Sequence, residues 1–167
     1  MKAYTFVNSY INGIQVGIQA GHAIVELMNS YQPMDSSVRA MMEDQNEDLN
    51  TELVQEWAES HKTFVWLDGG DSETMGVLAL SLHAASMPYA VFREPGLGNV
   101  VTAISTVLDT EQCELVDTLL SNRGWFSESG MEGDILFYDR DNKLLGYTDK
   151  MSGPIVELVA NSRLKSL

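Results

Sequence analysis

The sequence predicts an α/β fold, a three-layer sandwich in which helices cover both faces of a mixed sheet. Short runs of strand-forming residues alternate along the chain with longer stretches of helical periodicity. One of the short runs, residues 63–67 (TFVWL), is apolar without interruption, which is typical of a strand covered on both faces. The 167 residues, 44% of them hydrophobic, are enough for one compact core with a small appendage.

The first elements are a strand at residues 3–7 (AYTFV) and a helix at about 13–30. The sequence Tyr-Gln-Pro-Met-Asp breaks the pattern, and the acidic stretch 37–60 is helical again. We expect this stretch to form a solvated pair of helices that lies on the core. Its apolar residues form only a thin stripe: Val38, Met41, Met42, Leu49, Leu53, Val54 and Trp57.

A second helix of the core is predicted at about 72–86, after the sequence Asp-Gly-Gly-Asp. Either Asp71 or Ser72 is suited to be its N-cap, because a short polar side chain there accepts a hydrogen bond from the first turn. Pro88 ends this segment.

Two strands joined by a loop come next, at residues 89–93 (YAVFR) and 100–108 (VVTAISTVL). The loop between them is Glu-Pro-Gly-Leu-Gly-Asn. The resulting order of strand, helix, strand, helix, strand, loop and strand indicates a mixed sheet.

A further unit follows Leu108. Residues 109–121 form a capped helix, residues 124–133 a loop, and the runs DILFY and KLLGY a hairpin. A last helix starts near Pro154, since proline is favoured at the first helical position. The expected domains are therefore 1–108, with an acidic helical insertion at 32–60, and an extension of helix, hairpin and helix at 109–167 that packs on it.

The charge is strongly negative, with 10 Lys and Arg against 24 Asp and Glu, a formal net charge of −14. Residues 1–108 carry 4 of these bases and 13 of these acids. A protein that binds nucleic acid normally gathers several Lys and Arg on one face. The composition therefore disfavours a nucleic-acid partner, and an acidic surface more often means solubility or a basic protein partner.

The remaining composition bears on location and cofactors. No apolar run approaches the roughly 20 residues that cross a bilayer, and the N-terminus is too polar for a secretory signal, so we expect a cytoplasmic protein with no membrane partner. Cys113, the one cysteine, lies in the apolar phase of a predicted helix and is interpreted as buried. No cluster suggests a metal site or another cofactor. The sheet edge and the apolar residues of the tail are compatible with a homodimer.

The helix at 13–30 departs from the usual division into one apolar and one polar face. Its apolar residues surround nearly the whole circumference, and the exceptions, Gln15, Gln19, His22 and Glu26, form one line at i, i+4, i+7 and i+11. We expect a helix covered on most sides, with its polar line facing a functional site. The alternative is a line that faces bulk water, and a lone histidine such as His22 is as often structural.

A second set of polar residues is expected to converge on this line. Arg93 and Glu94 stand where a strand ends, the usual place for functional groups in α/β sheets. Asn99 lies in the following loop, and the next strand is punctuated by Thr102, Ser105 and Thr106.

Two segments resemble the signatures of type 2 peptidyl-tRNA hydrolases. Residues 13–23 (GIQVGIQAGHA) are similar to the family's glycine-rich turn and helix, Lys-Ile-Ala-Ala-Gln-Cys-x-His-Ala. Residues 91–108 (VFREPGLGNVVTAISTVL) are similar to its Asp-x-Gly loop and the strand with a late Thr. The resemblance covers about 1–31 and 61–108, and the acidic insertion and the extension lie outside it.

The resemblance implies a metal-independent hydrolase that cleaves the ester between a peptide and the terminal ribose of tRNA. Residue by residue, it implies roles for Gln19, His22 and Thr106. Glu94 stands at the position of the family's loop Asp, Gln15 at that of its Lys, and Gly98 at that of its loop Thr.

Two hypotheses follow. In the first, the protein hydrolyses peptidyl-tRNA or a related aminoacyl ester, with His22, Glu94 and Thr106 as catalytic residues and with substrate held by Gln15, Gln19, Asn99 and Arg93. In the second, it is an inactive relative that binds a protein or ligand through its acidic surface and extension. The loss of a cation at Gln15 favours the second, since one such electrostatic contribution is worth about 10²–10³ in rate.

Overall fold

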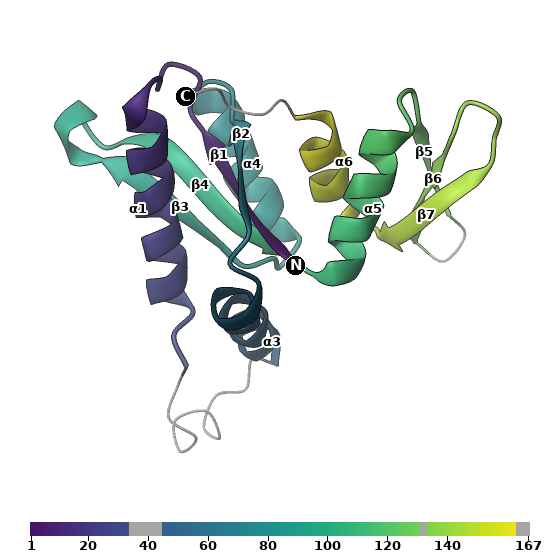
Figure 1. The fold of residues 1–167 in the computed structure, drawn as a ribbon, viewed down its shortest axis with the longest axis horizontal. Coiled ribbons are helices and arrows are strands. Elements are labelled where there is room, and N and C mark those ends of the chain that lie inside the picture. The colour runs from purple at the N-terminus through teal and green to yellow at the C-terminus, as the bar shows by residue number, and fades with distance from the viewer. Residues whose placement is uncertain (34–44, 131–132, 163–167) are drawn as a thin grey trace.

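The computed structural model describes residues 1–33, 45–130 and 133–162. A four-stranded sheet, in the order β2-β1-β4-β3, forms the centre of the molecule (Figure 1). Its strands are β1 (Lys2–Val7), β2 (Phe64–Asp68), β3 (Tyr89–Glu94) and β4 (Val100–Leu108). β1 is parallel to β2 and antiparallel to β4, which is antiparallel to β3. The mixed sheet of the sequence prediction is confirmed, and the C-terminal ends of β1, β2 and β3 share one edge, here called the carboxyl edge.

Helices cover both faces of this sheet. α1 (Ile14–Ser30) packs on one face against β3 and β4, and α4 (Ser72–Ala84) packs on the other (Figure 1). Alternate residues of β1 divide between the two layers, since Phe6 belongs to the cluster on the α4 side and Val7 to a cluster with α1. The three-layer sandwich is the predicted fold class.

The described part of the acidic stretch consists of α3 (Gln45–Glu56) and a short π-helix, η1 (Trp57–His61). Val54 and Trp57 are buried against Leu27 of α1 and the strand residues Ala3 and Val107. The stretch therefore lies on the core through part of its thin apolar stripe. Val38, Met41 and Met42 fall outside the described residues.

The N-caps are formed as the local sequence predicts. The Asp71 carboxylate accepts a hydrogen bond of 2.9 Å from the backbone N–H of Thr74, which settles the choice between Asp71 and Ser72. α5 (Thr110–Ser121) begins with a capping box, in which Asp109 and Gln112 bond each other's backbone N–H groups. Cys113 is buried, as expected, in the first turns of α5.

The C-terminal part contains a three-stranded antiparallel sheet, β5 (Phe126–Ser129), β6 (Asp134–Tyr138) and β7 (Leu144–Asp149). The hairpin of β6 and β7 was predicted, whereas the prediction of a loop throughout 124–133 was wrong. β5 forms there because it pairs with β6 and stacks Phe126 on Tyr138, with ring centroids 5.6 Å apart.

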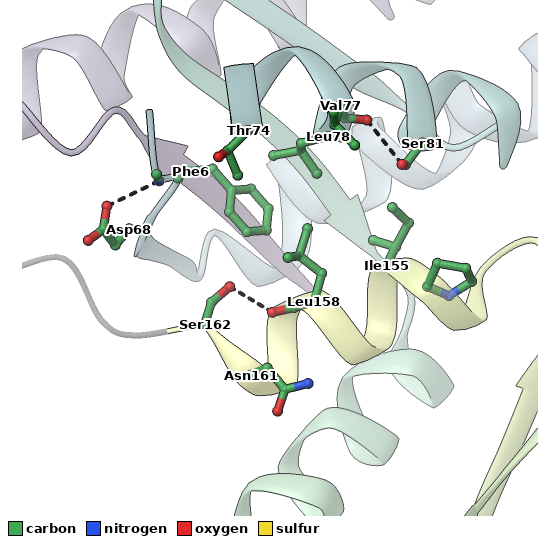
Figure 2. A pocket seen from close by; sticks show the side chains of 13 residues that line it. Phe6, Asp68, Thr74, Val77, Leu78, Ser81, Ile155, Leu158, Asn161 and Ser162 are labelled. Carbon is green, nitrogen blue, oxygen red and sulfur yellow. Dashed lines mark hydrogen bonds between the residues drawn. The ribbon is translucent and has the colours of Figure 1, made fainter. Parts of the chain in front are cut away.

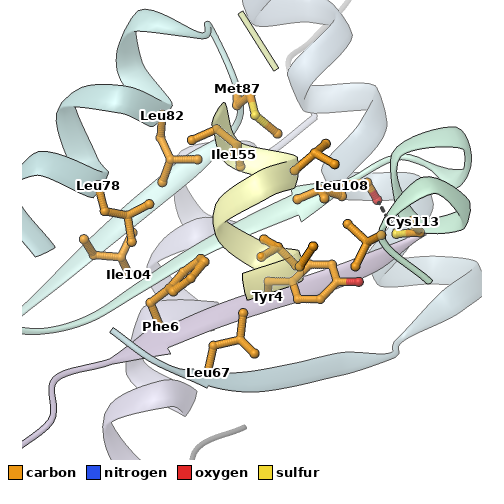
Figure 3. Close-up of a cluster of buried hydrophobic side chains, with 14 of the residues drawn as sticks. Tyr4, Phe6, Leu67, Leu78, Leu82, Met87, Ile104, Leu108, Cys113 and Ile155 are labelled. Atoms are coloured by element: carbon orange, nitrogen blue, oxygen red, sulfur yellow. Dashed lines mark hydrogen bonds between the residues drawn. The ribbon is translucent and has the colours of Figure 1, made fainter. Parts of the chain in front are cut away.

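The last helix, α6 (Gly153–Asn161), returns to the first unit and completes its core. Figure 3 shows the result on the α4 side of the sheet, where side chains from β1, β2, α4, β4 and α6 meet. They include Tyr4, Phe6, Leu67, Leu78, Leu82, Ile104, Leu108 and Ile155. Within the described chain, no helix is both long and apolar enough to cross a membrane.

β2 is an edge strand and not a strand covered on both faces, so the prediction from the TFVWL run was wrong. Phe64 is half exposed, and of the five residues of β2 only Leu67 is buried. Trp66 lies under α1, where its ring is 3.4 Å from a Cβ built on Gly17. The apolar run thus reflects partial cover by the helices on each side.

Candidate active site

The polar line of α1 runs along the boundary between the covered and the open side of the helix. Gln19 is 4% exposed and faces the sheet, whereas Gln15, His22 and Glu26 are exposed. The expectation of a helix covered on most sides was wrong. α1 is covered on the single face that contacts the sheet, and its other apolar side chains are open to solvent: Ile14, Ile18, Val25 and Met28.

Gln19 is held by two hydrogen bonds that use both ends of its amide. Its Nε2 donates to Oε2 of Glu94 at 2.9 Å, and its Oε1 accepts from Oγ1 of Thr102 at 2.5 Å. The ionised Glu94 carboxylate only accepts hydrogen bonds, so it must face the Nε2 of the Gln19 amide. The Thr102 hydroxyl then faces the amide oxygen and donates to it. The two partners therefore fix the orientation of the Gln19 amide. These residues are called the Thr102–Gln19–Glu94 chain below.

A β-bulge in the β3–β4 hairpin brings Thr102 to this side of the sheet. Phe92 pairs with Ala103 and Arg93 pairs with Val101, so Thr102 has no partner residue on β3. In a regular strand, Thr102 and Ala103 would point to opposite faces. The extra residue lets both face α1, Ala103 through the apolar cluster and Thr102 through its bond to Gln19.

Glu94 is the last residue of β3 and lies at the carboxyl edge. Its Oε1 accepts a hydrogen bond of 3.2 Å from the backbone N–H of Gly96, the middle residue of the 3-10 turn η2 (Pro95–Leu97). The pKa of Glu94 is lowered, first by the Gln19 amide and next by the Gly96 N–H, against a smaller opposing effect of burial. His22 contributes a further small lowering. The carboxylate is therefore ionised at neutral pH and partly exposed.

His22 lies one turn beyond Gln19 and stacks on Phe92, with ring centroids 4.5 Å apart and an angle of 17° between the planes. The stack fixes the plane of an exposed imidazole beside Glu94. Arg93 points to solvent and donates to the backbone carbonyl of Asn99 at 3.3 Å. Asn99 has φ 62° and closes the loop through its N–H, which donates to the carbonyl of Glu94.

Thr106 is not brought to this site. It is fully buried, and its Oγ1 donates to the carbonyl of Pro88 at 2.7 Å. It pairs with Tyr89 at the start of β3, five residues from Glu94 and thus roughly 16 Å along the strand. Thr102 is the threonine that the structure places with Gln19 and Glu94. In the sequence, Thr102 could be singled out because it lies close to the loop that follows Glu94. Whether its side chain faces α1 depends on the β-bulge, which the sequence does not show.

The other predicted residues keep their places on the surface. Gln15 is exposed one turn before Gln19, and Glu26 is exposed one turn after His22. In the parts of the chain that the structure describes, no three His, Cys, Asp or Glu side chains gather as metal ligands. The arrangement is thus an open, partly exposed group of a carboxylate, an imidazole and an oriented amide.

Comparison with models of known families places the chain. The family model described as "Peptidyl-tRNA hydrolase PTH2" matches residues 10–122, that is, 113 of the 167 residues. The matched range contains α1, the β3–β4 hairpin and the whole Thr102–Gln19–Glu94 chain, and it runs on through the acidic stretch and α5. No curated protein sequence matches the chain.

Proposed function

Because the chain belongs to the PTH2 family of peptidyl-tRNA hydrolases, we propose that it hydrolyses the ester between a peptidyl group and the terminal ribose of tRNA. The observation that carries the proposal is the Thr102–Gln19–Glu94 chain, which holds an ionised carboxylate beside the exposed imidazole of His22. A site that is open on the surface suits a macromolecular substrate.

In the proposed reaction, Glu94 and His22 orient a water molecule against the ester carbonyl carbon. The water oxygen forms a new bond to that carbon, the bond to the ribose oxygen breaks, and the ribose oxygen takes up a proton. The products are a peptide carboxylate and a tRNA with a free hydroxyl. Gln19 is a positioning residue, since it holds Glu94, and Thr102 acts through Gln19.

The substrate side of the proposal depends on Gln15, which is exposed one turn before Gln19 on α1. Arg93 stands between Phe92 and Glu94 on β3, and the alternation of side chains along a strand turns it to the face of the sheet opposite to α1. Lys2 is the first residue of β1, and Lys62 comes just before β2. Both therefore lie at the end of the strands opposite to Glu94. Arg93 is therefore the one base of the described residues 1–108 at the carboxyl edge. We expect weak binding of tRNA that falls off steeply with salt.

The test is turnover of N-acetylated aminoacyl-tRNA at low salt. Glu94→Gln should lower kcat/KM by roughly 10²–10³, the effect of removing one electrostatic contribution from a hydrolytic site. His22→Ala should also lower it. The matched control is Glu26→Gln, an exposed acid on the same line of α1 that lies outside the chain of hydrogen bonds, and its rate should stay within about twofold of the parent. Equal rates for Glu94→Gln and the parent would refute the role of Glu94.

The second candidate function is a binding module without hydrolytic activity, favoured by Gln15 at the family's Lys position and by the net charge of −14. Its basic protein partner would contact the acidic surface. Gln15→Lys distinguishes the two. In an enzyme it should raise turnover, because the cation can stabilise a developing oxyanion or hold a phosphate. If neither the parent nor Gln15→Lys turns over the substrate, and neither retains tRNA at low salt, the hydrolase proposal fails and the binding module stands.

A further inference from the structure

His22 and Glu94 are held in place in two different ways. The Glu94 carboxylate accepts two hydrogen bonds, one of 2.9 Å from Nε2 of Gln19 and one of 3.2 Å from the N–H of Gly96. The His22 imidazole makes no hydrogen bond within the parts of the chain that the structure describes, and its ring contact is the stack on Phe92. Glu94 interacts with it through charge, which does not fix the plane of a ring. The orientation of the imidazole therefore depends on Phe92.

The course of α1 over β3 produces both contacts. β3 ends at the carboxyl edge and α1 begins near it, after β1 has ended there, so the helix and the strand run in opposite directions. Gln19 and His22 are three positions apart on one side of α1, about 5–6 Å. Glu94 and Phe92 are two positions apart on one face of β3, roughly 7 Å. Because these two spacings are similar, Gln19 meets Glu94 and His22 meets Phe92.

A stack leaves more of an imidazole free than a hydrogen bond does. A histidine that is oriented by a hydrogen bond uses one of its two ring nitrogens for that bond. A ring stacked on Phe92 uses only its face, so both nitrogens at its rim can bond to water or substrate. The centroid distance of 4.5 Å and the angle of 17° fit an offset stack, an arrangement that aromatic pairs prefer. Phe92 thus orients His22 without occupying either nitrogen.

Phe92 can serve as the base of this stack because it is itself anchored in the core. It is partly buried and packs against the apolar cluster under α1, which includes Val16, Ala20 and Ala103. It also pairs with Ala103 in the β3–β4 hairpin, directly before the bulge. His22, in contrast, is exposed. The ring of Phe92 therefore links an exposed imidazole to a closely packed part of the molecule.

A cavity of about 450 Å³ lies on the other face of the sheet, between α4 and α6 (Figure 2). Its walls include Phe6, Leu78 and Leu158, and none of its lining residues belongs to α1 or β3. A substrate group in this cavity would be separated from His22 by the sheet. It could not orient the imidazole, so this role falls to a contact on the α1 side.

We propose that Phe92 is a positioning residue of the site: its ring holds the His22 imidazole in the orientation in which it acts on water. An aromatic pair of this kind favours the stacked arrangement by roughly two- to tenfold. The effect on the rate of hydrolysis rests on the function proposed above, whereas the effect on the imidazole follows from the geometry alone. Carboxylate and imidazole are then oriented independently, the one by Gln19 and Gly96 and the other by Phe92.

The first test follows the imidazole by NMR of the full chain in alkaline buffer. The ring current of Phe92 should shield the carbon-bound ring protons of His22, so that they lie upfield of those of His61, which stacks on no aromatic ring of the described residues. Phe92→Leu should remove this difference, and Phe92→Tyr should keep it. The matched control is Phe64→Leu, which removes a half-exposed ring beside Trp66 on β2 and should leave the His22 protons unchanged. His22 protons that stay upfield in Phe92→Leu would overturn the proposal.

The second test is turnover of N-acetylated aminoacyl-tRNA at low salt. Phe92→Leu should lower kcat by about three- to tenfold and leave KM within about twofold of the parent, because an imidazole that is not held spends less time in the productive orientation. Phe92→Tyr keeps an aromatic face and should retain the parent kcat, as should Phe64→Leu.

The outcomes of the two tests are separable. A parent kcat in Phe92→Leu, or an equal loss of kcat in Phe64→Leu, would overturn the positioning role. If the parent itself does not turn over the substrate, the hydrolase proposal fails, whereas the NMR test still decides whether Phe92 holds the imidazole of His22.

Discussion

The buried bond between Thr102 and Gln19 can be measured directly through stability. Thr102→Val leaves the Gln19 oxygen without its donor, and Gln19→Leu leaves the Thr102 hydroxyl without its acceptor, in both cases in a buried environment. A buried polar group that loses its partner costs about 1–3 kcal/mol. Each single variant should therefore lower the free energy of unfolding by about 2 kcal/mol, or Tm by about 4–8 °C in a chain of this length.

The double variant gives the decisive comparison. When both partners are replaced by apolar groups of similar shape, no unsatisfied group remains, so the double variant should cost about as much as one single variant. The coupling free energy from the double-mutant cycle, measured by urea unfolding, should then be about 1–2 kcal/mol. The bond from Gln19 to the partly exposed Glu94 adds little to this figure, because water replaces it.

The control for the cycle is Thr106→Val, which removes another buried hydroxyl of β4 that bonds elsewhere. Thr106 lies four residues from Thr102, roughly 13 Å along the strand, so the two changes should be additive within about 0.5 kcal/mol. Additive costs for the pair Thr102→Val and Gln19→Leu would refute the reasoning, since the bond would then contribute nothing to the placement of the amide.

Three further predictions follow from single features. The folded pKa of Glu94 lies below its ordinary value of 4.5, so its contribution to stability is present above pH 4.5 and is lost as the pH falls through the folded pKa. In Gln19→Leu, carboxyl NMR should show the pKa of Glu94 rising toward 4.5. An unchanged pKa would contradict the Gln19 amide as the main cause of the lowering. Asp109→Ala removes the bond that the Asp109 carboxylate accepts from the Gln112 N–H and leaves the reciprocal bond from the N–H of residue 109 to the Gln112 side chain. It should cost about 1 kcal/mol by urea unfolding, whereas no loss would mean that the carboxylate does not stabilise the first turn of α5. Gly153→Ala would place a Cβ 2.6 Å from Cγ1 of Ile135, and should cost about 1–3 kcal/mol unless α6 shifts, which a thermal melt would reveal as an unchanged Tm.

The strands and caps of the first unit were predictable because they are local. The apolar run at residues 100–108 predicts the same nine-residue strand that the structure contains. Asp71 and Asp109 each accept a hydrogen bond from a backbone N–H in the first turn of the helix that follows them. The converging site was predictable in part: Gln19, His22 and Glu94 do meet at one edge.

The errors have non-local causes. β5 exists only because β6 pairs with it, and its polar sequence FSES gives no strand signal alone. The choice between Thr102 and Thr106 depends on a bulge, and a bulge shifts which residues share a face without leaving a mark in hydrophobic periodicity. The exposure of Phe64 depends on the order of strands in the sheet, which no property of the run TFVWL reveals.

The return of α6 to the first unit has a consequence for the order in which the chain can fold during synthesis. Ile155, Val156 and Val159 pack in one core with Phe6, a partner about 150 positions earlier in the chain. A ribosome would therefore release β1, α4 and most of the family's domain well before the helix that covers their apolar side. During that interval, Leu78 and its neighbours are open to other nascent chains. A chaperone that binds apolar surface would have its longest opportunity there, and chains that stop at residue 122 would keep that surface permanently exposed.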